Sequence, residues 1–140
     1  MPWPDGSIDA VTCMHLVEHL NDLSLLFKEV SRLLKPGGRA YFETPHPRTV
    51  NYPSPPDGAA GTFTMNFYDD TTHTRPVSAG ALAQRGRQAG LEAVRSGISR
   101  NWLFAAAYGL YLFRKPSRQK YTAWGHLRGW STYLIARKPA

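Results

Sequence analysis

Residues 7–45 constrain the fold more than any other part of the chain. Two short apolar runs with β-branched residues, Ile8–Met14 and Arg39–Thr44, are bounded by turn residues and predict buried strands. Between them, apolar residues from Leu23 to Leu34 recur at i, i+3, i+4 and i+7, which predicts an amphipathic helix. A strand–helix–strand unit with parallel strands follows, and ligands of such units bind beyond the carboxyl ends of the strands.

The limits of this helix are also marked. Asn21 or Asp22 can accept a hydrogen bond from the free amides of the first turn. Pro36-Gly37-Gly38 ends the helix, because proline removes a donor and glycine permits a left-handed backbone. The predicted strands end at Cys13-Met14-His15 and Thr44-Pro45-His46, so functional residues are expected there.

The order and spacing of these residues resemble a known family. The resemblance lies in PWPDGSIDAVTCMHLVEHL followed by EVSRLLKPGGRAYFETP, which is similar to the middle of a class I methyltransferase dependent on S-adenosylmethionine, of the type 11/12 group. A weaker match, FYDDTTHTRPVSAGALAQRGRQAGLEAV, is similar to a segment in which a D-x-x-H-x-R loop leads into a helix. The resemblance implies an α/β fold with a partial Rossmann-like sheet: parallel strands, a crossover helix and an antiparallel final strand. It also implies methyl transfer from S-adenosylmethionine to a small organic acceptor.

One hallmark of the family is absent from the sequence. Members grip the cofactor chiefly with a Gly-rich loop and an acidic residue after their first two strands, but no G-x-G-x-x-G occurs here. We therefore expect a single partial domain, residues 1–140, with the first half of the fold missing. It would comprise the unit 1–45, a substrate-side loop 46–76, and helices and closing strands 77–140. A non-catalytic remnant or interaction module is the alternative.

The resemblance further implies which residues border S-adenosylmethionine. These are Trp3, which replaces an aromatic residue common before the first strand, then Cys13, Met14 and His15 at the strand end, and His19 in the next turn. The pair Glu18-His19 would orient this turn beside the methionine part of the cofactor. For Trp3, packing against the end of the sheet is an open alternative.

Residues 15–19 also spell H-x-x-E-H, the zinc motif of inverzincin proteases. In a helix, His15, Glu18 and His19 would share one face, so two imidazoles could bind a metal beside a glutamate base. The flanking strands fit the methyltransferase pattern instead. We therefore expect no metal site.

The loop 46–76, which is rich in Pro, Gly and Thr, is expected to build the substrate pocket. Loops this long are usually functional or disordered, and aromatic side chains suit an organic acceptor. The expected substrate-binding residues are His46, Tyr68, His73 and Arg75. Alternatively, the aromatic residues only attach the loop to the protein body.

The residue that would remove a proton from the acceptor is not singled out by the sequence. His15, His46 and His73 are candidate bases, because an ordinary imidazole titrates near neutrality. Asp70 could hold His73 or pair with Arg75, and both arrangements stay open.

The second half of the chain predicts scaffold and one unusual helix. Ser78 is expected to cap a helix to Ala89, a strand begins at Leu91, and residues 130–137 form the final strand. Asn101–Phe113 is apolar nearly all round and is followed at once by basic residues. It predicts either a core helix or lid, or a helix that lies on an anionic membrane surface.

Charge is divided unevenly between the halves. Residues 1–70 hold five Lys and Arg against nine Asp and Glu, whereas residues 71–140 hold twelve against one. No helix-turn-helix, zinc-finger or RNP-like pattern accompanies this charge, so no specific nucleic-acid partner is expected. The single cysteine, Cys13, and the lack of a secretory signal favour the cytoplasm.

The strand Ser7–Met14 has a further consequence if its usual neighbour is missing. Its edge would be apolar and unpaired. We therefore expect poor solubility, self-association or pairing with another chain.

Overall fold

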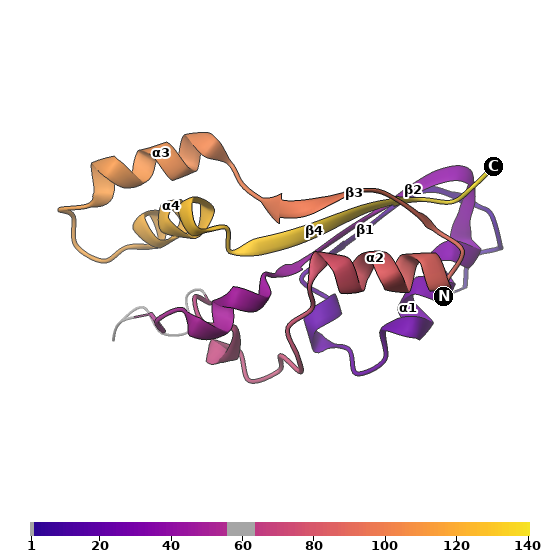
Figure 1. Ribbon diagram of the computed structural model, residues 1–140, viewed down its shortest axis with the longest axis horizontal. Coiled ribbons are helices and arrows are strands. Elements are labelled where there is room, and N and C mark those ends of the chain that lie inside the picture. The colour runs from indigo at the N-terminus through magenta and orange to yellow at the C-terminus, as the bar shows by residue number, and fades with distance from the viewer. Residues whose placement is uncertain (1, 56–63) are drawn as a thin grey trace.

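The computed structural model describes residues 2–55 and 64–140, which form a four-stranded mixed sheet with strand order β1-β2-β4-β3 (Figure 1). β1 and β2 are parallel, and β4 lies between β2 and β3, antiparallel to both. The parallel strands, crossover helix and antiparallel final strand match the expected fold class. The strands are β1 (Ile8–Met14), β2 (Leu34–Pro45), β3 (Glu92–Ser99) and β4 (Ser131–Arg137), and the helices are α1 (Leu23–Leu33), α2 (Ala79–Gln88), α3 (Trp102–Tyr111) and α4 (Arg118–Arg128).

Helix α1 forms where the periodicity predicts it. The Asp22 carboxylate accepts a hydrogen bond from the Ser24 amide at 2.8 Å, so Asp22 rather than Asn21 is the cap. The apolar stripe of the helix packs on the sheet, where Phe27 stacks on Phe42 of β2 with ring centroids 4.4 Å apart. Packing between α1 and β2 therefore fixes the position of the crossover helix on the sheet.

The sheet has one covered and one open face. Helices α1 and α2 lie on the same side of it, and α3 and α4 lie beyond one end (Figure 1). The core lies between the sheet and helices α1 and α2, and it includes the fully buried Phe27, Phe42, Leu82 and Leu134. Within residues 2–55 and 64–140, no helix covers the opposite face.

The Pro-Gly-Gly segment follows the helix end and Gly37 has the predicted left-handed backbone, with φ 78°, but the segment already belongs to β2. α1 ends at Leu33, and β2 begins directly at Leu34 rather than at Arg39. The pairing register with β1 shifts here, because Ile8 pairs with Leu34 whereas Ala10 pairs with Arg39. Residues 35–38 of β2 have no partner in this register. Gly38 is required here, because an added Cβ would lie 2.9 Å from a backbone oxygen of Lys35.

The carboxyl terminus ties this segment down. The amide of Gly37 donates to the Lys138 oxygen, and the amide of Lys138 donates to the Gly38 oxygen, each at 2.9 Å. The Lys138 ammonium also donates to the Leu34 oxygen at 2.8 Å. Hydrogen bonds between residues about a hundred positions apart therefore hold the start of β2 in place.

The predicted elements of the second half are confirmed, with one omission. Ser78 caps α2 by accepting from the Ala81 amide, and β3 and β4 occupy the expected strand regions. Helix α4 was not expected. It is capped by Ser117 and ends at Gly129, whose φ of 76° suits glycine.

Helix α3 is not a core helix, which corrects that part of the expectation for residues 101–113, whereas a lid and a membrane-surface helix both stay predictions. Ala105 is the only buried residue of α3, while Leu103 and Leu110 are 83% and 77% exposed. No helix in the described part of the chain is long and apolar enough to cross a membrane.

Candidate functional site

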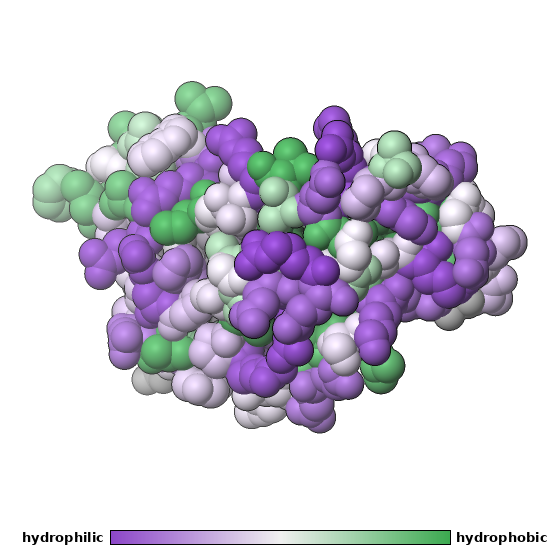
Figure 2. Space-filling view, turned by 45° about the vertical axis from the view of Figure 1, so that its right-hand side comes forward, coloured by the Kyte–Doolittle hydropathy of each residue, from purple (hydrophilic) through white to green (hydrophobic). Residues whose placement is uncertain are grey.

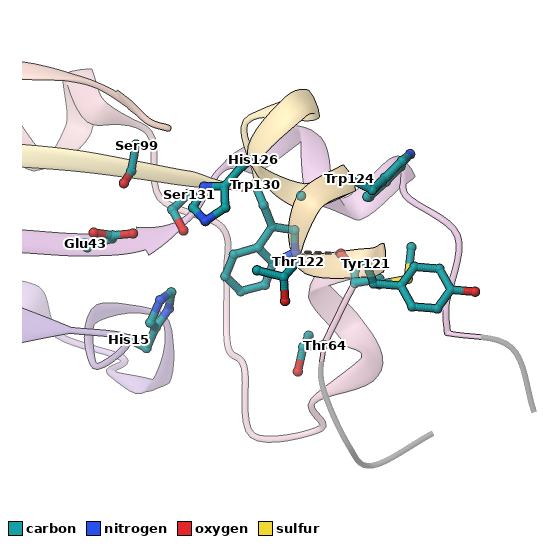
Figure 3. Close-up of a pocket in the computed structure, with 12 residues that line it drawn as sticks. His15, Glu43, Thr64, Ser99, Tyr121, Thr122, Trp124, His126, Trp130 and Ser131 are labelled. Atoms are coloured by element: carbon teal, nitrogen blue, oxygen red, sulfur yellow. Dashed lines mark hydrogen bonds between the residues drawn. The ribbon is translucent and has the colours of Figure 1, made fainter. Parts of the chain in front are cut away.

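A cavity of about 270 Å³ opens at one edge of the sheet (Figure 3). His15 follows the carboxyl end of β1, Glu43 lies near that of β2, Ser99 ends β3, and Ser131 begins the antiparallel β4. All four strands therefore contribute from the same edge, as expected for a ligand site of a parallel α/β unit. Helix α4 and its neighbours complete the wall with Thr64, Met65, Tyr121, Thr122, Trp124, Gly125, His126 and Trp130.

The Trp130 indole lies at the centre of this cavity wall (Figure 3). Its Nε1 donates to the Met65 oxygen at 2.9 Å, and its ring centroid is 5.4 Å from that of His15. On the far side, His126 Nδ1 accepts a hydrogen bond from the Asn101 amide at 3.2 Å. The indole is thus held in place and offers a flat apolar surface to a ligand.

His15 has an unusual backbone that turns it into the cavity. Its φ is 51°, a left-handed value that few residues other than glycine adopt. The amide of His15 donates to the Glu43 oxygen at 2.9 Å, and its Nδ1 lies 3.1 Å from Glu18 Oε1. With Nδ1–H donated to Glu18, the lone pair of Nε2 is available to accept a proton.

Glu18 is a fully buried carboxylate behind His15. Burial alone would raise its pKa, but hydrogen bonds from His15, its own backbone and Thr44 hold the pKa below the ordinary value of 4.5. The Thr44 hydroxyl donates to the second carboxylate oxygen at 2.9 Å. Glu18 is therefore ionised at neutral pH and orients the His15 ring.

A second carboxylate, Glu43, lies on the open face of the sheet beside the cavity. It is 8% exposed and accepts a hydrogen bond from the Tyr41 hydroxyl. Burial, together with the neighbouring Glu43, raises the pKa of Tyr41 to about 12. Tyr41 is therefore a neutral donor to Glu43 rather than a base.

His19 and His73 pack together behind this turn, with ring centroids 4.8 Å apart. His73 Nδ1 lies 2.6 Å from the Phe67 oxygen, and His19 Nδ1 lies 2.9 Å from the Thr72 hydroxyl.

The structure also distinguishes the two possible partners of Asp70, His73 and Arg75. Its carboxylate lies 3.8 Å from His73 Nε2, whereas Arg75 donates to the Asn21 oxygen.

The H-x-x-E-H motif does not have protease geometry. Only Val17–His19 forms a short 3-10 turn, and the left-handed His15 lies outside it, so His15 and His19 do not share a helical face. Glu18, His19 and His73 instead bring potential ligand atoms within 4.8 Å of one another. Both oxygens of Glu18 already accept hydrogen bonds. The expectation of no metal site stays a prediction.

Comparison with known proteins identifies the family. A family model described as a methyltransferase domain matches residues 2–96, more than half of the chain. The chain belongs to this methyltransferase family. Its sheet is a partial Rossmann-like sheet of the class I, S-adenosylmethionine-dependent type.

Individual relatives agree with this assignment. A ubiquinone biosynthesis O-methyltransferase from Ralstonia nicotianae is 35% identical over 89 residues, which are 62% of this chain and 37% of that protein. A methyltransferase solved in complex with the Trm112 methyltransferase activator of Haloferax volcanii has a TM-score of 0.65 at 18% identity, with 100% of this chain and 58% of that chain covered. A methyltransferase from Archaeoglobus fulgidus has a TM-score of 0.60 at 22% identity, with 96% and 61% covered. This methyltransferase chain therefore spans between about a third and two thirds of the length of these relatives.

The expected cofactor residues of this methyltransferase are only partly brought together. Met14, His15 and His19 lie at the carboxyl end of β1, and Met14 is 58% exposed. The Cys13 side chain belongs to the core, where burial raises the pKa of its thiol. Trp3 lies before the amino end of β1, about 20 Å away along the strand, so it does not join the others.

None of the expected substrate-binding residues lines the cavity that the described residues form. His73 is packed between His19 and Phe67, Arg75 binds a backbone oxygen, and Tyr68 is 60% exposed. His46 Nδ1 accepts from the Arg48 amide. Burial, with help from Arg48 and Arg100, lowers the pKa of His46. Of the three candidate bases, His15 alone lines the cavity. Residues 56–63 of the loop lie outside the described residues.

Several lining residues were missed from the sequence. Glu43 lies near a strand end that the parallel-strand rule points to, and Ser131 begins the antiparallel strand expected beside it, so both could have been found. Trp124, His126 and Trp130 could not, because they depend on α4, whose sequence carries no clear apolar periodicity.

Proposed function

We propose that this chain forms part of a methyltransferase domain that transfers a methyl group from S-adenosylmethionine to a hydroxyl of a small organic acceptor. The proposal rests chiefly on one observation, the His15–Glu18 pair at the mouth of a cavity beyond the carboxyl ends of β1 and β2. The hydroxyl acceptor is favoured by the names of the relatives, which are O-methyltransferases. The whole chain, residues 1–140, would be one partial domain.

The residues at the end of β1 suit one part of the cofactor. Met14 and His15 are accessible there, at the strand end where class I members are expected to place the methionine part. These residues and the buried turn around His19 would hold that part. When bound, S-adenosylmethionine supplies an electrophilic methyl group, so the protein mainly aligns an acceptor with it.

His15 would act as the base. Its Nε2 accepts the hydroxyl proton as the acceptor oxygen forms its bond to the methyl group, and the electron pair of the broken bond stays on sulfur. The buried Glu18 carboxylate stabilises the resulting imidazolium and keeps Nδ1 protonated. Glu43 lies nearby as a second polar anchor for the acceptor.

The other side of the cavity would bind the body of the acceptor. The Trp130 ring presents an aromatic surface there, while Tyr121 and Trp124 line the wall from α4 with their rings directed away from Trp130 (Figure 3). Such walls suit a flat organic molecule held by packing and by a small number of polar contacts. The loop residues His46, Tyr68, His73 and Arg75 would then act at the rim or as support rather than at the acceptor itself.

Calorimetric titration with S-adenosylmethionine tests the cofactor assignment. We expect micromolar binding, weakened about tenfold by Met14→Lys, which places a cation beside a sulfonium. Leu25→Lys is the matched control, because Leu25 is 67% exposed on α1, away from the site. Absence of binding would favour the alternative, a non-catalytic remnant or interaction module.

The role of His15 is tested by methyl transfer to a phenolic acceptor panel. Asparagine tolerates a left-handed backbone, so His15→Asn should fold normally and lower kcat by at least about a hundredfold. His46→Asn is the control, and an equal loss there would show that His15 has no special role.

The edge of β1 supports a proposal about self-association. β1 is an edge strand of the described sheet, and Thr12 and Met14 on it are exposed. An unpaired edge can add a strand from another chain. Light scattering should detect dimers or larger species, and Thr12→Lys should shift them to monomers while Gln84→Lys on α2 does not. A stable wild-type monomer would contradict the proposal.

A further inference from the structure

Helix α3 presents an apolar stripe to solvent. Leu103, Ala106, Leu110 and Phe113 recur at spacings of three and four residues, so they lie along one side of the helix and its last turn. Leu103, Leu110 and Phe113 are 83%, 77% and 100% exposed, and Trp102 beside them is 67% exposed. We call these five residues the α3 stripe. Solitary exposed apolar residues are common, but a continuous row of this kind marks an interaction surface.

The opposite side of α3 is occupied by α4. Ala105 is buried, and so is Ala123 on α4. Phe104 lies against His126, with ring centroids 5.5 Å apart. The two helices form a hairpin that extends past the end of the sheet (Figure 1). Because α4 takes the inner side, the α3 stripe faces away from the protein, and Figure 2 shows hydrophobic surface at that end of the molecule.

Cations gather beside the stripe. Arg114, Lys115 and Arg118 follow it in the turn to α4 and are exposed. Neither Lys115 nor Arg118 forms a salt bridge with any described residue. Residues 93–140 contain nine Lys and Arg and no Asp or Glu. The residues of this hairpin therefore contribute only positive charge to the local electrostatic potential.

We propose that the α3 stripe and its cations dock on the surface of an anionic lipid bilayer. A helix of ten residues is about 15 Å long, too short to span the hydrocarbon core but suited to lie in the interface. Trp102, Leu103 and Phe113 would enter the boundary between headgroups and acyl chains, while Lys115 and Arg118 contact lipid phosphates. Aromatic and aliphatic residues flanked by cations are the composition that such docking requires.

Charge disfavours a second copy of the chain as the occupant. Pairing two α3 stripes would bring the same uncompensated cations of both copies toward one another, and like charges at an interface are costly. An anionic membrane removes that repulsion and adds attraction. This proposal concerns the hairpin alone and does not depend on the proposed methyl transfer.

Vesicle co-sedimentation tests the proposal. The probes are vesicles of phosphatidylcholine alone and vesicles of equal parts phosphatidylcholine and phosphatidylglycerol. We expect binding to the anionic vesicles, strong weakening at high salt, and little binding to the neutral ones. A blue shift of tryptophan emission should accompany binding, since Trp102 would leave water. Failure to bind anionic vesicles at low salt overturns the proposal, as does equal binding to both kinds.

Two variants separate the apolar and ionic contributions. The triple change Leu103→Ser, Leu110→Ser, Phe113→Ser should abolish binding, and the double change Lys115→Glu, Arg118→Glu should weaken it at least about tenfold. The matched controls are Leu25→Ser on α1 and Arg87→Glu on α2, which should bind like the wild type. Circular dichroism checks folding, and the charge variant decides the matter if the triple variant unfolds. Equal losses in the controls, or a wild-type dimer that the triple change converts to a monomer, would overturn the proposal.

Discussion

The two faces of the sheet are made from the same four strands but differ in what covers them. On the covered face, Phe42 and Leu134 are fully buried beneath α1 and α2. On the open face, Tyr41 stacks on Tyr133 with ring centroids 6.1 Å apart, and both rings and Ile135 stay partly exposed. The covered face supplies the stability of the chain, whereas the open face is surface available to a ligand or a partner. Predictions about single residues can test this division.

The largest effect is expected on the covered face. Phe27→Ala removes a fully buried ring that stacks on Phe42 and should lower the free energy of unfolding by about 3–5 kcal/mol. Leu25→Ala, on the exposed side of the same helix, should change it by less than about 0.5 kcal/mol. Chemical denaturation measures both. Similar losses in the two variants would mean that α1 does not pack on the sheet as described.

Glu18 gives the next largest effect, and it depends on pH. Its pKa in the folded protein lies below the ordinary 4.5, so it stabilises the fold above pH 4.5 and this contribution is lost as pH falls through the folded pKa. Glu18→Gln should cost about 1–3 kcal/mol at neutral pH and progressively less in acid. The comparison is Glu43→Gln on the open face, for which we expect a smaller loss. Denaturation series across pH would show whether the two carboxylates differ.

A smaller effect is expected for the open face itself. Ile135→Ala removes a partly exposed side chain, so the free energy of unfolding should fall by only about 1 kcal/mol. A loss as large as that of Phe27→Ala would show that something covers this face in solution. Repeating the measurement at several protein concentrations would reveal whether that cover is a second copy.

The smallest effect concerns the cluster behind His15. Because both Glu18 oxygens already accept hydrogen bonds, Zn²⁺ should leave the Tm of the protein unchanged. A rise in Tm that His73→Ala abolishes would instead establish a metal site at Glu18, His19 and His73. It would also correct the prediction that this turn binds no metal.

The sequence predicts the covered face well, because its information is local. The stripe of α1, the Asp22 and Ser78 caps and the final strand are each visible in a few neighbouring residues. The parallel pairing follows from the helix between the two strands, because parallel neighbours are joined by a crossover of this kind. Likewise, His15 could be placed at the site because it follows the first strand directly.

The rest of the site could not be read in this way. Trp130 reaches the cavity only because α4 forms and β4 inserts between β2 and β3, which no short pattern in the sequence indicates. His73 and Arg75 lie against the Phe67 and Asn21 oxygens, and the substrate-binding role that their motif predicts stays a prediction. The left-handed backbone of His15 is not visible in its neighbouring residues either, and its amide donates to the Glu43 oxygen of the adjacent strand.

The attachment of Lys138 to residues 34–38 has a consequence for how the chain folds. The strand–helix–strand unit lies within residues 7–45, yet its second strand is fastened by Lys138, about a hundred residues further along the chain. Pairing of such distant residues is slow, because a long loop must close before the contact forms. During synthesis, the second strand therefore stays unfastened until residue 138 has left the ribosome. Removing residues 137–140 should leave every helix intact and still loosen the opposite end of the molecule from the site.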